Sequence, residues 1–195
     1  MKTYMQKIKN LGIDDKIFEK FELFASLLLK YNKTHNVSGV KTKKEIYKNI
    51  YDSIYPLKFL DFKSMKKVID IGSGAGFPGL LLAIVLSEVS FALYEPILKK
   101  SAFLHLMKSK LELKNVIVLS YRVEKSEPFD VDLITSRALS SAKILISLVA
   151  KFIKKDTKLL LYKGDKVEKE LEQIKNYDII QNEKRYYLLI KEINV

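Results

Sequence analysis

The sequence predicts an α/β fold, in which a mainly parallel β-sheet carries helices on both faces and follows an N-terminal helical extension. Short apolar runs alternate with helical segments from residue 67 onward, which is the pattern of a parallel sheet. A glycine-rich turn follows the first apolar run and leads directly into an apolar helix. The residues before it carry helical periodicity and helix-capping side chains.

Two helices are expected in the extension. Apolar residues recur at helical spacing over 14–31, and two aspartates at the start of this segment favour a helix N-terminus. The segment 31–39 is polar and typical of a turn. A second helix is expected over 42–60, because Thr42 and Glu45 have the spacing of a capping box.

The remaining elements follow from alternation of strand and helix patterns. Strands are expected at 67–71, 90–94, 115–119, 130–135 and 157–162, and helices near 78–87, 97–111, 139–153 and 165–176. A last strand is expected at 185–193 and can pair with 178–181, which gives a seven-stranded sheet.

Length and composition predict one domain over 1–195, with 1–62 as a basic helical extension and 63–195 as the cofactor-binding α/β core. The absence of cysteine excludes disulfides, thiolate metal ligands and a cysteine nucleophile. No metal site is expected. The chain has neither an apolar signal segment nor a membrane-spanning run, so we expect a cytoplasmic protein without a membrane partner.

The net charge of +12 favours a polyanionic partner. Residues 1–66 hold 14 lysines against 7 carboxylates, so this third of the chain carries more than half of the excess charge. Because 32 of the 35 basic residues are lysine, codon bias explains the same composition. Phosphate binding requires these charges to cluster on one face, and both interpretations stay open at this level.

The glycine-rich turn allows two registers, each with its own cofactor. Gly74, Gly76 and Gly79 fit G-x-G-x-x-G, the dinucleotide fingerprint. That fingerprint opens directly at the end of a strand. Here the strand ends at Ile71, so the first glycine of the turn is Gly72, and this position disfavours the dinucleotide register.

Read from Gly72, the turn has the form D-x-G-x-G-x-G, and Phe77 occupies the position of the third dinucleotide glycine. This pattern, over Asp70, Gly72, Gly74 and Gly76, resembles motif I of the S-adenosylmethionine (SAM) methyltransferases. The glycines allow close approach of the backbone to the methionine part of SAM. The acidic side chain can hold the ammonium group of SAM.

A second carboxylate agrees with an adenosine cofactor. Glu95 ends the strand that follows the turn, about 20 residues on, where a carboxylate commonly accepts both ribose hydroxyls. This position fits NAD and SAM equally. Gly72, Glu95, the segment 121–124 and Arg137 all follow predicted strand ends, so we expect one site to gather them.

The methyl acceptor is restricted by what the sequence lacks. Methylation at cytosine C5 needs a cysteine, and the chain has none. Methylation of the adenine amino group usually uses an Asn/Asp-Pro-Pro-Tyr/Phe box, but residues 135–139 of this chain read Thr-Ser-Arg-Ala-Leu. Metal-dependent catechol-type transfer needs clustered carboxylates near strand ends, and the sequence shows no such cluster. Ring nitrogens such as guanine N7 remain, because their lone pair attacks without loss of a proton and needs positioning rather than a general base.

Several blocks of the sequence resemble one family. These blocks lie at 31–40, 52–54, 70–79, 120–124, 135–138 and 162–164 and together cover roughly 25–165. The chain resembles the RsmG (GidB) family of bacterial 16S rRNA guanine-N7 methyltransferases. This resemblance implies a class I SAM-methyltransferase (Rossmann-like) fold, SAM as methyl donor, and a guanosine in the decoding-region loop of 16S rRNA within the small ribosomal subunit as target. It also suggests a monomer.

The resemblance implies SAM contacts at Gly72, Phe77, Val123, Glu124 and Arg137. One departure is Asn49, where many members carry His before an Asp-Ser pair. Beyond residue 165 the resemblance is weak, and nothing is carried over there.

The residues themselves leave several roles open. Arg137, one of three arginines, offers the fixed planar donors that lysine lacks, either to the cofactor carboxylate or to the guanine edge. Arg122 is a candidate for an rRNA phosphate or for pairing with Glu124, and Lys163 and His35 are further RNA-binding candidates. The alternatives to a methyltransferase are a non-catalytic SAM- and RNA-binding protein and, less favoured, a NAD-binding oxidoreductase.

Overall fold

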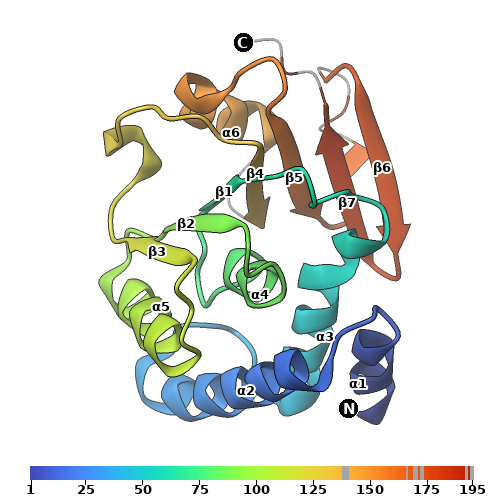
Figure 1. The fold of residues 1–195 in the computed structure, drawn as a ribbon, viewed down its shortest axis with the longest axis vertical. Helices are drawn as coiled ribbons and strands as arrows, with labels where there is room; N and C mark the ends of the chain where they lie inside the picture. The colour runs from blue at the N-terminus through green and yellow to red at the C-terminus, as the bar shows by residue number, and fades with distance from the viewer. Residues whose placement is uncertain (138–140, 166, 169–170, 172–173, 192, 194–195) are drawn as a thin grey trace.

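The structure, a computed structural model, describes residues 1–137, 141–165, 167–168, 171, 174–191 and 193. Its centre is a seven-stranded sheet in the order β3-β2-β1-β4-β5-β7-β6 (Figure 1). The strands are β1 Lys67–Ile71, β2 Ser90–Tyr94, β3 Val116–Leu119, β4 Leu133–Arg137, β5 Lys158–Lys163, β6 Tyr177–Asn182 and β7 Arg185–Ile190. The first five are parallel, and β7 is antiparallel to both β5 and β6. The prediction of a mainly parallel, seven-stranded sheet is confirmed, and the sheet is mixed.

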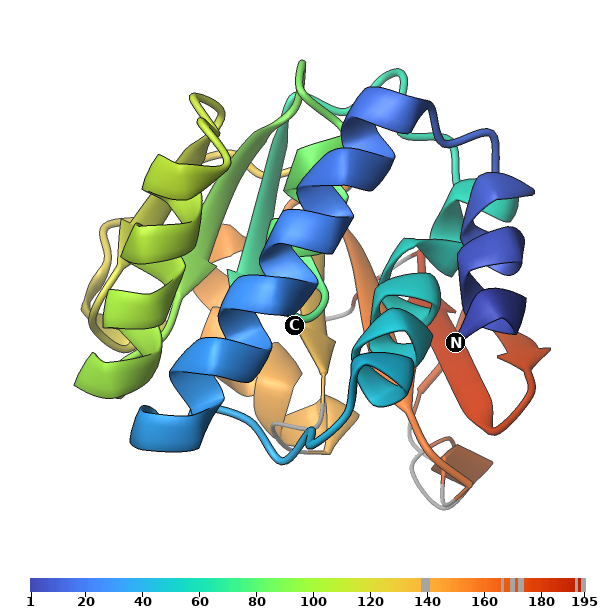
Figure 2. The same cartoon turned by 90° about the horizontal axis from the view of Figure 1, so that it is seen from below.

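Helices cover the two faces unequally. The α-helices are α1 Lys2–Lys9, α2 Asp15–His35, α3 Lys43–Ile54, α4 Gly79–Val85, α5 Leu98–Lys110 and α6 Ala142–Val149. Short 3₁₀ helices include η1 Tyr55–Lys58, η2 Val123–Lys125 and η3 Ala150–Phe152. Helices α1 to α5 lie over one face of the sheet, and α6 lies over the other (Figures 1 and 2). Strand ends near the middle of the sheet therefore lie between two helical layers.

The expected caps form at both extension helices. The Asp14 side chain accepts a hydrogen bond from the Ile17 N–H at 2.8 Å, which satisfies one unpaired donor at the start of α2. At α3 the Thr42 side chain and the Glu45 carboxylate bond reciprocally to each other's backbone, so the predicted capping box is confirmed. These local signals set where α2 and α3 begin.

The extension and the sheet share one apolar core. Its buried residues run from Ile8 in α1 through the α2 and α3 faces to strands β1, β2 and β7. Two buried tyrosines strengthen the junction: the Tyr162 hydroxyl donates to the Ser53 carbonyl at 2.7 Å, and the Tyr187 hydroxyl donates to the Asp52 carbonyl at 2.9 Å. Helix α3 is therefore fixed to the sheet by hydrogen bonds as well as by packing.

The extension differs from expectation in three ways. Helix α1 was not predicted. Helix α2 continues to His35 instead of ending near 31, because the Asn32 side chain binds the backbone of the next loop and Asn36 provides a left-handed end. The expected helix over 42–60 ends at Ile54, where a 3₁₀ turn containing Pro56 follows, since proline lacks the N–H that a continuing helix needs.

In the core, β1 and β2 lie where expected, and the other predicted bounds differ by a few residues. Strand β4 occupies 133–137 rather than 130–135, because the Asp132 carboxylate accepts from two backbone N–H groups beside β1 and holds its own segment as a loop. Helix α6 begins after the Ser141 N-cap, so the helix expected over 139–153 is shorter. Parts of the helix expected over 165–176 lie outside the described residues.

Candidate active site

A cavity of about 650 Å³ lies at the carboxyl ends of the central strands, the edge where parallel α/β sheets place ligands. Its lining comes from the turn after β1, the end of β2, the end of β4, helix α3 and the loop between α2 and α3. The lining residues are Val37, Ser38, Gly39, Val40, Asn49, Gly72, Ser73, Gly74, Ala75, Phe77, Glu95, Pro96, Ile97, Lys100, Arg122 and Arg137.

The turn after β1 exposes backbone to this cavity. Gly72, Gly74 and Gly76 all have φ in the left-handed region, at 71°, 57° and 99°, which side chains rarely tolerate. The Gly72 and Ser73 N–H groups donate to the Tyr94 carbonyl, so the turn is attached to the end of β2. A Cβ atom on Gly76 would stand 2.9 Å from Leu80, so Gly76 allows close packing of turn against helix.

Asp70 lies beneath the turn and does not line the cavity. Its side chain is fully buried; Oδ1 accepts from the Thr135 hydroxyl at 2.7 Å and Oδ2 from the Gly79 N–H at 3.2 Å. Burial raises the pKa of this carboxyl to about 6, against the opposing effect of those hydrogen bonds. A Cβ on Gly79 would stand 2.5 Å from Asp70 Cβ, so this close approach requires glycine. Here the carboxyl supports the shape of the turn.

Glu95 faces the cavity with a fixed carboxylate. Oε2 accepts from the Gly74 N–H at 2.8 Å, and Oε1 accepts from the Ile97 N–H at 2.9 Å. A carboxylate has about four acceptor positions, so each oxygen can accept one further donor. Glu95 can therefore hold the turn and bind two hydroxyl groups of a ligand together.

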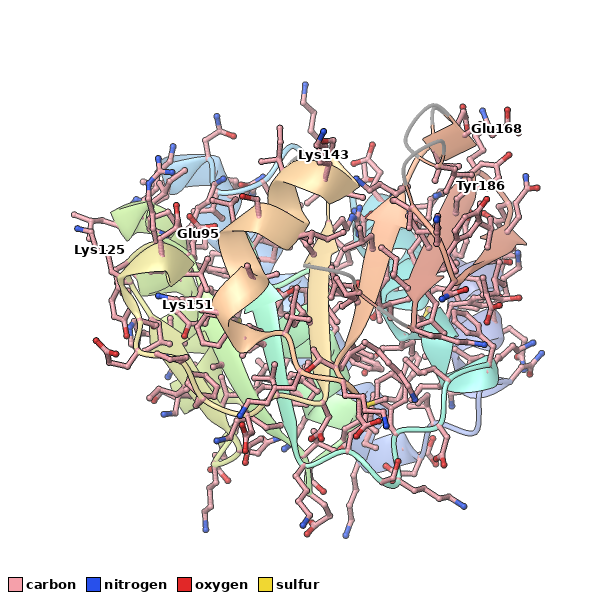
Figure 3. The ribbon with its side chains drawn as sticks, turned by 90° about the horizontal axis from the view of Figure 1, so that it is seen from above. Glu95, Lys125, Lys143, Lys151, Glu168 and Tyr186 are labelled. Atoms are coloured by element: carbon pink, nitrogen blue, oxygen red, sulfur yellow. The ribbon has the colours of Figure 1, made fainter. Side chains whose placement is uncertain are left out.

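A second hollow of about 240 Å³ adjoins the first and shares Gly72, Pro96 and Arg122 with it. Val123 and Glu124 of η2 and the rings of Tyr94 and Tyr121 also line it. The Lys151 ammonium donates to the Glu124 carbonyl at 2.8 Å and to the Ser126 carbonyl, and thereby ties η2 to the far side of the sheet. Figure 3 labels Lys151 at the end of α6 that faces η2.

Arg137 projects from the end of β4 with one nitrogen uncommitted. Its Nη2 donates to the Asn49 side chain at 2.5 Å, and its guanidinium carbon lies 5.5 Å from the centre of the Phe77 ring. Nη1 is buried and has no hydrogen-bond partner among the described residues. Burial, followed by repulsion from Arg185, lowers the pKa of Arg137 to about 10, so it stays charged near neutral pH.

Buried charges lie beneath Arg137. Asp52 is fully buried, with Oδ2 at 3.4 Å from the Lys48 ammonium and 3.6 Å from Arg185 Nε. Within the described part of the chain, Asp52 Oδ1 and Arg185 Nε have no hydrogen-bond partner. Such atoms are uncommon in protein interiors, and each calls for a specific explanation.

The structure gathers most, but not all, of the predicted site residues. Eight line the two hollows: Gly72, Gly74, Phe77, Glu95, Arg122, Val123, Glu124 and Arg137. Four do not: Asp70, Gly76, Lys163 and His35. His35 is exposed at the end of α2 with its ring 4.3 Å from that of Tyr31, and Lys163 ends β5. Ala138, part of one sequence block, lies outside the described residues.

The sequence did not predict a cavity role for Asn49, for the loop 37–40 or for Lys100. Asn49 was noted only as a departure from the family pattern. These residues reach the cavity because the extension packs against the sheet, and no local motif records that packing.

The lining offers charged and polar groups that can anchor a ligand. It contains carboxylate, ammonium, guanidinium and phenol groups, and among the described residues neither hollow is lined by histidine. Across the described residues, no group of three or more His, Asp or Glu side chains is placed to hold a metal ion. The charged lining is suited to positioning a charged, hydroxyl-bearing ligand.

None of the described helices has the length and apolar character needed to cross a membrane.

Comparison with known structures supports the fold. A putative S-adenosyl-L-methionine-dependent methyltransferase from Methanococcus maripaludis has a TM-score of 0.59 at 17% identity, covering 88% of this chain and 93% of that one. A putative O-methyltransferase from Klebsiella pneumoniae has a TM-score of 0.62 at 9% identity, covering 87% and 90%. At these identities the likeness concerns the fold, and the predicted class I methyltransferase architecture is confirmed.

Sequence comparison is more specific. The family model of GidB, described as rRNA small subunit methyltransferase G, matches residues 17–193. A ribosomal RNA small subunit methyltransferase G from Aliarcobacter butzleri is 43% identical over 184 residues, covering 93% of this chain and 94% of that protein. Its counterpart from Wolinella succinogenes is 40% identical, covering 96% and 94%. The chain therefore belongs to the GidB family, the rRNA small subunit methyltransferases G.

Proposed function

We propose that this protein is a SAM-dependent methyltransferase that modifies N7 of a guanosine in the decoding-region loop of 16S rRNA. The observation that carries the proposal is the cavity in which the glycine turn, Glu95 and Arg137 meet. Family membership supports the same activity, because the relatives are named for methylation of small-subunit rRNA.

The residues of the two hollows fit SAM. A glycine-lined turn leaves room for the methionine part, since among the described residues a Cβ on Gly74 would meet only the Gly72 carbonyl oxygen, at 3.8 Å. Glu95 has acceptor capacity left for two ribose hydroxyls. Val123 and Glu124 line the smaller hollow, where an adenine ring fits. Asp70 and Gly76 act from beneath by holding the turn.

SAM supplies an electrophilic methyl group on its sulfonium. Guanine N7 bears no hydrogen and has an in-plane lone pair, so its methylation would need no residue of the protein to remove a proton. The protein must align the two reactants and exclude water. Arg137, held between Asn49 and the Phe77 ring, lines the cavity and is placed to donate to the cofactor carboxylate or the guanine edge.

The macromolecular partner in this proposal is the small ribosomal subunit or its 16S rRNA. Arg122 is exposed at the junction of the two hollows, which suits a contact with an RNA phosphate. Lys163 and His35 lie outside the lining and are RNA contacts only if the RNA extends beyond the cavity. We infer a cytoplasmic monomer of one domain, with residues 1–62 as its extension.

Labelled SAM and small subunits from a strain that lacks the enzyme test the proposal. We expect label in 7-methylguanosine after nuclease digestion, and none when fully methylated subunits are used. Folded protein that leaves guanosine unlabelled contradicts the catalytic claim and favours a non-catalytic SAM- and RNA-binding protein. Calorimetric titration with SAM and with NADH tests the cofactor, and binding of NADH alone contradicts it.

A further inference from the structure

The contact between Asn49 and Arg137 joins the helical extension to the end of β4. The donor Nη2 and the acceptor Oδ1 are 2.5 Å apart, although the residues are 88 positions apart in the chain. Among the described residues this is the one hydrogen bond recorded for the guanidinium, and the Phe77 ring packs against its face. The orientation of Arg137 therefore depends on Asn49.

A competing acceptor lies beneath the cavity. Asp52 follows Asn49 by three positions on α3, is fully buried, and its Oδ1 has no hydrogen-bond partner among the described residues. Its negative charge attracts the Arg137 guanidinium. Asn49 lines the cavity and Asp52 does not. Arg137 thus has one acceptor on the cavity side and a more strongly charged one beneath.

Hydrogen bonds fix the backbone of helix α3 at the position that carries Asn49. The Ser53 hydroxyl donates to the Asn49 backbone carbonyl at 2.7 Å, and two buried tyrosine hydroxyls donate to the carbonyls of Asp52 and Ser53. These hydrogen bonds do not involve Arg137, so the position of α3 does not depend on the conformation of Arg137. The backbone from which the Asn49 side chain reaches Arg137 is therefore fixed independently of Arg137.

We propose that Asn49 is a positioning residue: its Oδ1 holds the Arg137 guanidinium toward the cavity and away from Asp52. In this arrangement the guanidinium lines the cavity in which the cofactor or the guanine base would bind. The inference rests on the proposed methyl transfer for its kinetic consequence. Its structural consequence, the direction of Arg137, is independent of activity.

Asn49→Ala is the first test, with Asn10→Ala at the exposed C-cap of α1 as a matched control. We expect the single-turnover rate constant at saturating SAM and subunits to fall about 30-fold, the size associated with losing one hydrogen bond to a charged group. The control should match the wild type. Asn49→Asp keeps an acceptor and should recover most of the rate. Crystal structures should show Arg137 turned toward Asp52 in Asn49→Ala alone.

Asn49→His adds a readout that a purely structural role would not move. A neutral imidazole can accept from Arg137, whereas an imidazolium cannot, so the variant should lose rate relative to wild type as pH falls below about 6.5. The nearby Arg137 charge moves this loss to lower pH. Among the described residues, the charged and titratable groups near position 49 include Lys48 and Asp52 on α3, Arg137 on β4, Tyr162 on β5, and Arg185 and Tyr187 on β7. Glu95, Lys100 and Arg122 line the same cavity as Asn49.

The outcomes separate the inference from the proposed function. If Arg137 keeps its direction in the Asn49→Ala crystal structure, the positioning role is wrong, whatever the rate. If wild-type protein transfers no methyl group but Arg137 turns in the variant, the positioning role stands and the proposed activity fails. If Asn49→Ala does not fold, the Asp and His variants decide. Only a positioning role predicts a rate constant near wild type for Asn49→Asp together with a loss of rate at low pH for Asn49→His.

Discussion

Two polar regions lie side by side: the glycine turn after β1, and the charged layer beneath Arg137, which is formed by Asp52, Arg185 and Arg137 itself. They differ in how fully their polar atoms are hydrogen-bonded. In the turn, both oxygens of Asp70 and both oxygens of Glu95 accept from described donors. Beneath Arg137, by contrast, Asp52 Oδ1, Arg137 Nη1 and Arg185 Nε lack hydrogen-bond partners among the described residues.

This difference distinguishes a region that supports the structure from a region that can gain stability when a ligand binds. A buried polar atom without a partner costs about 1–3 kcal/mol, so a fully bonded turn can be stable and rigid without a ligand. The layer beneath Arg137 keeps that cost at three atoms: Asp52 Oδ1, Arg137 Nη1 and Arg185 Nε. The turn defines where a ligand lies, and Arg137 is the group with unused capacity to hold it.

The largest effect is expected from Arg137→Ala. Removing the uncommitted donor should lower the methyl-transfer rate about 1000-fold, the upper range for loss of one preorganised donor at a reacting centre. The fold should persist, because the bonds of the turn do not involve Arg137. Transfer to small subunits and circular dichroism together check this. If the variant transfers methyl groups near the wild-type rate, Arg137 is a structural residue, and the turn and the layer beneath Arg137 do not differ in function.

The next largest effect concerns the turn. Gly79→Ala would place a Cβ 2.5 Å from the Cβ of Asp70, which is fully buried and whose carboxylate is hydrogen-bonded to Thr135 and to the Gly79 N–H. We expect the free energy of unfolding to fall by about 4 kcal/mol, at the severe end for single substitutions. Gly164→Ala, where a Cβ meets nothing within 4 Å in the described part of the chain, is the matched control. Equal denaturation midpoints for both variants would show that Asp70 is not a rigid support.

Asp70 predicts a pH dependence of stability. Its pKa is raised to about 6 in the folded protein, above the ordinary 3.8, so the folded state binds the proton more tightly than the unfolded one. The contribution is complete below about pH 4 and is lost as pH rises through 6, amounting to about 3 kcal/mol. The stability of Asp70→Asn should therefore increase relative to wild type between pH 4 and 7. Parallel pH profiles in denaturant titrations would contradict this.

The smallest effect is expected at η2. Lys151→Met removes the ammonium that bonds two carbonyls of the η2 segment but keeps the apolar stem. We expect SAM to bind about fivefold more weakly, near 1 kcal/mol, with little change in melting temperature. Lys143→Met, on the same side of the sheet but at the other end of α6 (Figure 3), is the control. Equal SAM affinities would show that η2 needs no such tie.

Local chemistry explains what the sequence could predict. The glycine turn, the capping box at Thr42 and the strand over 67–71 each arise from residues within a few positions of one another. The carboxyl-end location of Glu95 and Arg137 followed from strand alternation alone. Such features are local, so one chain suffices to predict them.

Tertiary packing explains the rest. The direction of the Asp70 side chain depends on Thr135, 65 positions away, and the cavity role of Asn49 depends on Arg137, 88 positions away. Strand β4 is shifted because the Asp132 carboxylate binds backbone beside β1. No periodicity in the sequence encodes these pairings, which is why Asn49 was missed and Asp70 was expected to face the ligand.

The hydrogen bond from the Tyr187 hydroxyl to the Asp52 carbonyl spans 135 positions, and it has a consequence for the time order of synthesis. A ribosome makes α3 early and β7 late, with an interval of roughly ten seconds at ordinary bacterial rates. During that interval Asp52 has neither Tyr187 above its carbonyl nor Arg185 beside its carboxylate. A nascent or clipped chain without β7 lacks Arg185 and Tyr187 and therefore cannot complete the charged layer beneath Arg137. Competence for methyl transfer should therefore arrive with the last hairpin.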